Sequence, residues 1–233
     1  MNRILITGCP RSGTSQFCKI LSKNNNINLW SDGHEYQYEP FSTRPSMRFD
    51  ESDWIQNFLN RNESEFVGFK MFNGDTSSVT ETAKRFDMKL IPVLRKDIIS
   101  VYLSLALLPL QEKNKNNHSS RNTNCGLEKI LFEVGGFRRL KKNAFWLLKQ
   151  YYLWERTPTF QKVYFEDMMN GVEYPKLNEY FNTKITFGLD GYKHMGYETY
   201  TKDWEKLLSP LADMLHLAKK SGNFPDYIHN VDI

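Results

Sequence analysis

The segment that most constrains the fold of this chain runs from Ile4 to Leu21. It opens with the apolar residues Ile4-Leu5-Ile6, continues through a turn that contains two glycines, and ends in a helical pattern over 15–21. A tight glycine turn between a strand and a helix is typical of α/β proteins. Backbone N–H groups point into such a turn, and the helix start adds about half a positive charge. The segment therefore predicts a site for an anion.

The two glycines of the turn, Gly8 and Gly13, have the spacing of a phosphate-binding loop. In nucleoside-triphosphate hydrolases a lysine follows the second glycine, whereas Thr14 follows it here. The cation of this loop is instead Arg11, which comes shortly before Gly13. Glycines also mark ordinary strand-to-helix turns, so the spacing alone leaves a plain turn as the alternative.

The composition is that of a globular protein. Its 233 residues suit one domain, 1–233, and its contents of 40% hydrophobic and 25% charged residues are ordinary. The net charge of +4 fits a small polyanionic ligand, and no dense basic and aromatic patch indicates nucleic-acid binding. The 3 cysteines lack a Cys-x-x-Cys pair and indicate neither a disulfide framework nor a metal site. Without a signal-peptide pattern or a membrane-length apolar run, we expect a cytoplasmic protein.

Apolar periodicity predicts strands that alternate with helices. Beyond the first strand and helix, the expected strands are 27–30, 66–72, 89–94 and 160–165, and the expected helices are 50–61, 78–86, 97–108, 127–155 and 204–220. The longest helix is expected to break near Gly135-Gly136 and to bury Phe145 and Trp154. The alternation predicts a mostly parallel sheet in a three-layer α/β/α fold. The spacing of Gly8 and Gly13 adds a resemblance to the fold of P-loop nucleotide hydrolases. Ligands should bind at the carboxyl ends of its strands.

Two long polar segments interrupt this pattern. Residues 31–48 are rich in aromatic and turn residues, and a loop of this length is more often functional than idle. Residues 111–126 are polar and rich in asparagine, which predicts a mobile excursion that can serve as a lid. We expect both segments to line the pocket for a substrate. Their aromatic residues are compatible with a small molecule such as a phenol, with a glycan or with a lipid, and do not decide among them.

Four segments between Arg3 and Met168 carry a family resemblance. Gly8–Ser15 has an arginine ahead of Ser-Gly-Thr, and Val67–Lys70 ends in a lysine. Leu94–Asp97 places an arginine after a predicted strand. The last segment, Val163–Met168, has the sequence Val-Tyr-Phe-Glu-Asp-Met. In this order the segments resemble the PAPS-dependent sulfotransferases, which transfer a sulfuryl group from 3'-phosphoadenosine-5'-phosphosulfate (PAPS) to an acceptor. The late segment of that family has a tyrosine where Phe165 stands here.

The resemblance implies PAPS as the donor, PAP as the product and no metal. Arg95 would grip the 3'-phosphate with paired donors, together with Ser104, for which Ser100 is a rival by spacing. Lys70, with Arg11, would neutralise the charge that builds on the bridging oxygen during transfer. The loop residues that would bind the 5'-phosphosulfate are Pro10, Arg11, Ser12, Gly13, Thr14 and Ser15.

A general base must take the proton of the acceptor, and the segment 31–48 offers three candidates. Glu39, before Pro40, resembles the Glu-Pro of several branches of the family, and Glu35 resembles the Glu-Tyr of another. We therefore rank Glu39 ahead of Glu35, with His34 third. The alternative is that all three are solvated loop residues. The oligomeric state stays open.

Two other functions fit parts of the sequence: a P-loop nucleotide or small-molecule kinase, and a catalytically inactive nucleotide-binding protein. Thr14 argues against the kinase, because the lysine that compensates the phosphate charge is missing from the loop. The strand 89–94 also leads into Arg95, which suits a phosphate better than Mg²⁺. For Arg95 itself the plain alternative is an ion pair with Asp97 or Glu166, which contributes little to stability at a surface.

Overall fold

The computed structural model of this chain describes residues 2–30, 51–60, 63–71, 76–106, 131, 135–187 and 204–221. The chain divides into two compact units. The first comprises Met1–Arg95 and Thr157–Leu189, and the second comprises Lys96–Arg156 and Asp190–Ile233. The expectation of one domain over 1–233 stays a prediction.

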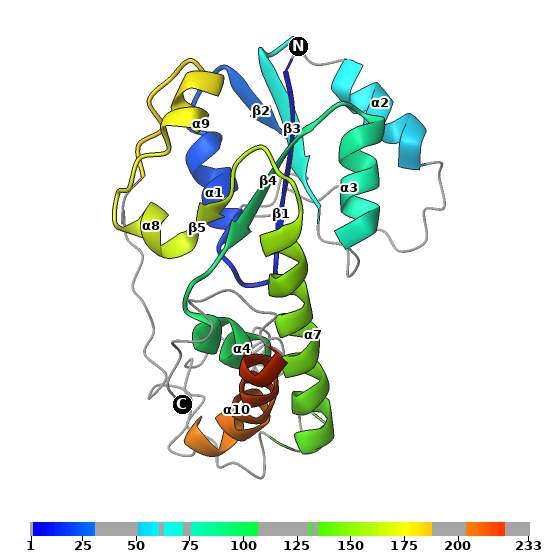
Figure 1. Ribbon diagram of the computed structural model, residues 1–233. Coiled ribbons are helices and arrows are strands. Elements are labelled where there is room, and N and C mark those ends of the chain that lie inside the picture. Colours follow the sequence, from blue (N-terminus) through cyan, green and yellow to red (C-terminus); the bar gives the residue numbers. More distant parts are fainter. Residues whose placement is uncertain are drawn as a thin grey trace, which may run out of the picture. The chain divides into compact units, whose positions relative to one another are not determined.

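The first unit is built on a five-stranded sheet in which every strand pairing is parallel (Figure 1). The strands lie in the order β2-β3-β1-β4-β5, so β1 is central. The predicted α/β fold with a mostly parallel sheet is thus confirmed. The strand bounds are β1 (Asn2–Gly8), β2 (Ile27–Leu29), β3 (Phe66–Lys70), β4 (Lys89–Leu94) and β5 (Val163–Tyr164).

Helices lie on both sides of this sheet (Figure 1). One side holds α1 (Thr14–Leu21), α8 (Phe165–Met169) and α9 (Pro175–Tyr180), and the other holds α2 (Glu51–Asn60) and α3 (Thr76–Arg85). Right-handed crossovers require α1 to lie opposite α2 and α3, because the chain moves one way along the sheet from β1 to β2 and the opposite way afterwards. With both faces covered, β1 and β4 are near-continuous apolar runs rather than alternating ones.

Three predicted elements in the first unit had wrong boundaries. The strand expected at 66–72 is shorter, and β3 ends at Lys70. The helix expected at 78–86 begins earlier, at Thr76, because several capping residues follow one another there and Ser78 lies inside the helix. The Ser78 carbonyl accepts a hydrogen bond from Thr82 Oγ1 at 2.9 Å. The strand expected at 160–165 is shortened to β5, and Phe165 already begins α8. Phe160 still reaches the sheet, since its N–H donates to the Leu90 carbonyl at 2.9 Å.

Three helices of the second unit are described over their full length, and they pack against one another. They are α4 (Ile98–Ala106), α7 (Gly136–Arg156) and α10 (Trp204–Ser221). The buried Tyr102 hydroxyl of α4 donates to the Leu207 carbonyl of α10 at 3.0 Å. Asp97 caps α4 as predicted, because its Oδ1 accepts the Ser100 N–H at 3.0 Å.

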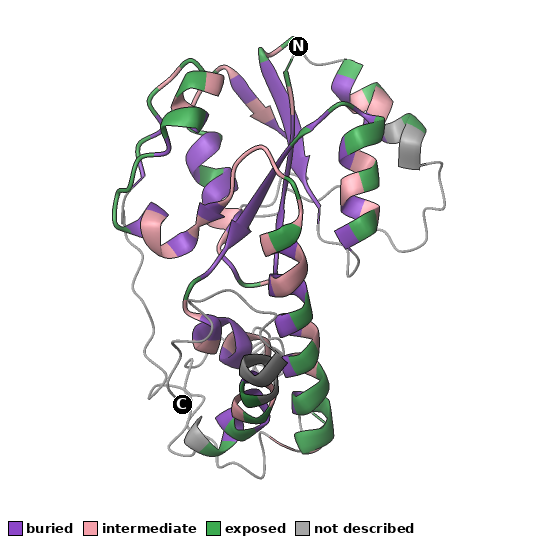
Figure 2. Ribbon diagram, viewed as in Figure 1, coloured by how far each residue is buried: buried purple, intermediate pink, exposed green. Residues whose placement is uncertain are grey.

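The long helix of the second unit confirms two predictions and corrects one. Gly135 and Gly136 have φ angles of +80° and +76°, and α7 begins there, as expected of a break. Trp154 is buried, but Phe145 is 62% exposed, so its predicted place in the core is wrong. Phe145 lies on the side of α7 opposite Leu140, Leu147 and Tyr151, which pack inward, and Figure 2 shows exposed residues along that helix. Within the described residues, no helix is both long and apolar enough to cross a bilayer.

Candidate functional site

The strand order places three of the predicted site segments at neighbouring strand ends. The glycine loop follows β1, Lys70 ends β3, and Arg95 follows β4, and β3 and β4 flank β1 in the sheet. The helix after β1 lies on one face and the helix after β3 on the other. Adjacent strands whose following helices lie on opposite faces form a topological switch point, where open parallel sheets bind ligands.

The first half of the glycine loop is held against β4. A Cβ on Gly8, which has a φ angle of +148°, would lie 2.1 Å from the Val93 carbonyl oxygen. The buried Ser12 hydroxyl donates to the same oxygen at 2.7 Å, and the Ser12 N–H donates to the Cys9 carbonyl at 3.1 Å. Both donors of Ser12 therefore shape the loop. Burial also raises the pKa of the Cys9 thiol, so this cysteine stays protonated and is a poor nucleophile.

The second half of the loop becomes the start of α1. Gly13 has a φ angle of +94° and precedes the first helical residue, Thr14. The first described helical bond runs from Phe17 N–H to the Gly13 carbonyl at 3.0 Å, so the N–H groups of the first turn have no acceptor within the helix. No acidic residue lies in this turn. The exposed Arg11, at a φ angle of +68°, adds a cation beside an end of the helix that favours anions.

Lys70 brings a second cation to the same helix start. Its side chain is buried at the carboxyl end of β3, where it pairs in register with Ile6 of β1. The Lys70 ammonium donates to the Ser15 hydroxyl at 3.0 Å. A buried ammonium is costly unless polar groups surround it, and the Ser15 hydroxyl at the first turn of α1 is one such group. The structure thus brings together Lys70 and Ser15, which the sequence predicted for one site.

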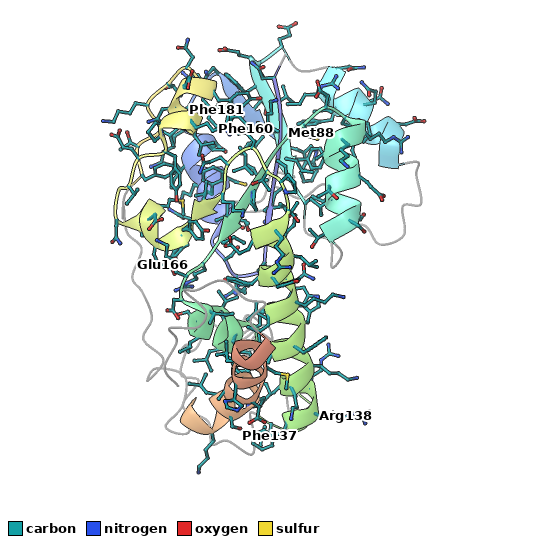
Figure 3. The ribbon with its side chains drawn as sticks, viewed as in Figure 1. Met88, Phe137, Arg138, Phe160, Glu166 and Phe181 are labelled. Atoms are coloured by element: carbon teal, nitrogen blue, oxygen red, sulfur yellow. The ribbon has the colours of Figure 1, made fainter. Side chains whose placement is uncertain are left out.

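Arg95, at the end of β4, has one acidic and one aromatic neighbour. Its Nε lies 3.5 Å from Glu166 Oε1, so the ion pair considered from the sequence is present. Its guanidinium carbon lies 4.9 Å from the centre of the Phe165 ring, within the range of a cation–π contact. Figure 3 labels Glu166 at α8. The side chain of Arg95 is buried, so these contacts hold the guanidinium in a defined orientation.

Phe165 connects the two positive elements, although in the sequence it stands out only as a departure from a family pattern. Its ring fills the space beside Gly13, where an added Cβ would lie 2.2 Å from Phe165 Cδ2. The same ring faces the Arg95 guanidinium. The preceding Tyr164 N–H donates to the Tyr174 hydroxyl at 2.8 Å, and burial raises the pKa of Tyr174 to about 12. The sequence signal that pointed to Phe165 was an aromatic residue at the end of a predicted strand. Its partners could not be predicted, because they depend on the strand order.

The two candidate serines of the second unit differ in their partners. The Ser100 hydroxyl is hydrogen-bonded to Asp97 Oδ2, and its N–H donates to Oδ1 of the same carboxylate. A carboxylate repels a phosphate, so the surroundings of Ser100 are less suited to the 3'-phosphate than its spacing indicated. Ser104 is half-buried on α4. Arg95 belongs to the first unit and both serines to the second.

The remaining predicted site residues lie outside the described part of the chain. These are the candidate bases Glu39, Glu35 and His34, together with the expected excursion at 111–126. Pro10 lies within the loop and is half-buried. The part of the predicted site that the structure describes therefore consists of the loop, the start of α1, Lys70 and Arg95.

No protein-family model matches this sequence, and no curated protein matches it either. The likeness to the sulfotransferases rests on the four segments named above and on what their residues can do chemically.

Proposed function

We propose that this chain is a PAPS-dependent sulfotransferase, with a P-loop-like nucleotide-binding fold, that transfers a sulfuryl group to a hydroxyl or amine of its acceptor. The observation that carries the proposal is the 3.0 Å contact between Lys70 Nζ and Ser15 Oγ. A nucleotide hydrolase keeps its phosphate-binding lysine inside the loop, where Thr14 stands here. In this chain the buried cation comes from the strand beside the loop, where the family resemblance expects it.

PAPS carries two separate anionic groups, and the first unit has two separate positive elements. The start of α1, with Arg11 and Lys70, would hold the 5'-phosphosulfate. The guanidinium of Arg95 would hold the 3'-phosphate, and the role expected of Ser104 from the sequence stays a prediction. These groups are hydrogen-bond donors, as a multiply charged anion requires. Once bound, PAPS supplies a sulfuryl group that its phosphate leaving group has already activated.

In the proposed reaction, the bond between sulfur and the bridging phosphate oxygen breaks as the acceptor atom bonds to sulfur. The acceptor proton passes to Glu39 or Glu35, with His34 as the third candidate. Negative charge gathers on the bridging oxygen, and the charges of Lys70 and Arg11 would stabilise it there. PAP leaves as the second product.

Calorimetric titration with PAP and, separately, with ATP–Mg²⁺ tests the donor site. We expect wild type to bind PAP without metal and to prefer it over ATP–Mg²⁺. Replacing Arg95 by alanine should weaken PAP binding by roughly ten- to a hundredfold, because charge-assisted hydrogen bonds to a phosphate are lost. The matched control is Arg85→Ala, which removes an exposed arginine at the end of α3 and should leave the affinity unchanged.

Three outcomes of this titration are informative, provided that thermal unfolding shows each variant to be folded. Tight PAP binding that only Arg95→Ala weakens supports the proposed donor site. A preference for ATP–Mg²⁺ contradicts the sulfotransferase and favours a P-loop kinase. Tight PAP binding without turnover across a broad panel of hydroxyl and amine acceptors favours a nucleotide-binding protein without catalytic activity.

Glu166→Gln should raise the affinity for PAP by about threefold to tenfold. The Glu166 carboxylate lies 3.5 Å from Arg95 Nε and competes with a phosphate for the same guanidinium. Glutamine keeps the size of the side chain and removes its charge. The measurement is the same titration at low and at high salt, because a charge effect should shrink as salt increases. A loss of affinity would instead mean that Glu166 orients Arg95 for the ligand.

A further inference from the structure

One face of α7 presents basic side chains around an exposed aromatic ring, in a part of the molecule that the proposed reaction does not use. We name this face the α7 basic face. Figure 3 labels Phe137 and Arg138 at the beginning of the helix. Its basic residues are all exposed: Arg138, Lys141, Lys142 and Lys149. Its aromatic residues are Phe145, which is 62% exposed, and Phe137, which is 45% exposed.

Helical geometry places Phe145 in the middle of the charges. Lys141 and Lys142 precede it by one turn, Lys149 follows it by one turn, and Arg138 lies two turns before it. From Arg138 to Lys149 the face extends about 16 Å along the helix. The opposite side of α7 is buried, so this side is the one that a partner can reach.

The charge of this face is not balanced within the helix. The sequence from 136 to 154 contains no acidic residue. The ion pair recorded for the face joins Lys141 to Asp213 of α10 at 3.4 Å, and both side chains are more than half exposed. Such exposed ion pairs contribute little to the stability of the fold. Cations near the start of a helix also oppose its dipole, so this charge does not serve the stability of α7.

We propose that the α7 basic face docks the protein onto the surface of an anionic lipid bilayer. Lysine and arginine side chains are long enough to reach phosphate headgroups while their helix lies in the plane of the membrane. An exposed phenylalanine between them can then enter the boundary with the acyl chains. Duplex nucleic acids and sulfated polysaccharides offer the anionic charge but little apolar surface, so they leave Phe145 and Phe137 without a role. This inference does not depend on the proposed sulfuryl transfer.

Co-sedimentation of the full chain with phosphatidylcholine vesicles, with and without phosphatidylserine, tests the proposal. Wild type should bind the vesicles that contain phosphatidylserine, and high salt should release it. Lys142→Gln with Lys149→Gln should weaken binding by about tenfold or more, because each basic residue near a charged surface contributes separately. Phe145→Ser should weaken binding as well, although it changes no charge. The control is Lys84→Gln with Lys89→Gln, which alters the net charge equally and should retain binding.

All of these side chains are exposed, so the variants should keep the melting temperature of wild type. Three results would overturn the proposal: no binding to anionic vesicles, an equal loss in the control variant, or vesicle binding that Phe145→Ser leaves intact. Titration with heparin and with duplex DNA completes the test. Tighter binding to either polymer than to the vesicles, unaffected by Phe145→Ser, would assign the face to a polyanion instead.

Discussion

Replacing Lys70 by methionine is expected to lower the turnover number for the proposed sulfuryl transfer by about a hundred- to a thousandfold. The reason is that Lys70 holds its charge beside the start of α1, with Nζ 3.0 Å from Ser15 Oγ. A positioned donor that meets charge only as it develops contributes about this factor to catalysis. Methionine has a similar length and suits the apolar surroundings of a buried strand end, so the fold should persist.

Two further variants separate the charge of Lys70 from its contact with Ser15. Lys70→Arg keeps a positive charge and should retain more activity than Lys70→Met, whereas Ser15→Ala removes the contact but keeps the lysine and should cost less. Initial rates over a range of PAPS concentrations separate the effect on kcat from the effect on KM. A raised KM with an unchanged kcat would show that Lys70 binds the ground state and the transition state equally. That result would contradict its proposed catalytic role.

Replacing Gly13 by alanine is expected to lower the free energy of unfolding by about 3 kcal/mol. Two effects add. The φ angle of +94° is unfavourable for a residue with a Cβ atom, and that Cβ would lie 2.2 Å from Phe165 Cδ2. The ring of Phe165 is buried and cannot move aside without disturbing its contact with Arg95. Urea-induced unfolding measures the loss.

Gly171→Ala is the matched control for this prediction. Gly171 belongs to the same unit and has a φ angle of +72°, but a Cβ there would meet its nearest neighbour at an ordinary 3.8 Å. Its loss should therefore be only about 1 kcal/mol, from the backbone conformation alone. In a double-mutant cycle, Phe165→Ala should reduce the penalty of Gly13→Ala, because it vacates the space that the new methyl group needs. Equal losses at the two glycines would contradict the steric part of the explanation.

Local patterns were sufficient to predict most elements of the chain. The apolar runs of β1 and β4 and the Asp97 cap of α4 all depend on residues within a few positions of one another. The same holds for the break at Gly135, where a positive φ angle favours glycine. Where neighbouring signals competed, prediction lost accuracy, as at Thr76, which begins a helix within a run of several capping residues.

The burial of the aromatic residues of α7 was not predicted correctly from the local sequence. Aromatic content suggested that Phe145 would join Trp154 in the core, yet the two lie on different sides of α7. Which side of a helix packs inward depends on the helices beside it, here α4 and α10. A large apolar side chain is usually buried, so an exposed one between basic residues is informative.

The sequence by itself determined the strand, the glycine turn and the helix of the candidate anion site, because glycine conformation and helix capping are local properties. It also determined that Arg11 and Arg95 would follow strands and that Lys70 would lie in one, whereas the end of β3 at Lys70 comes from the structure. Only the tertiary structure decided that β3 and β4 flank β1, which brings Lys70 to Ser15 and Phe165 between Gly13 and Arg95. The physical reason is that strand order depends on how crossovers cover the two faces of the sheet. No single segment of the chain contains that information.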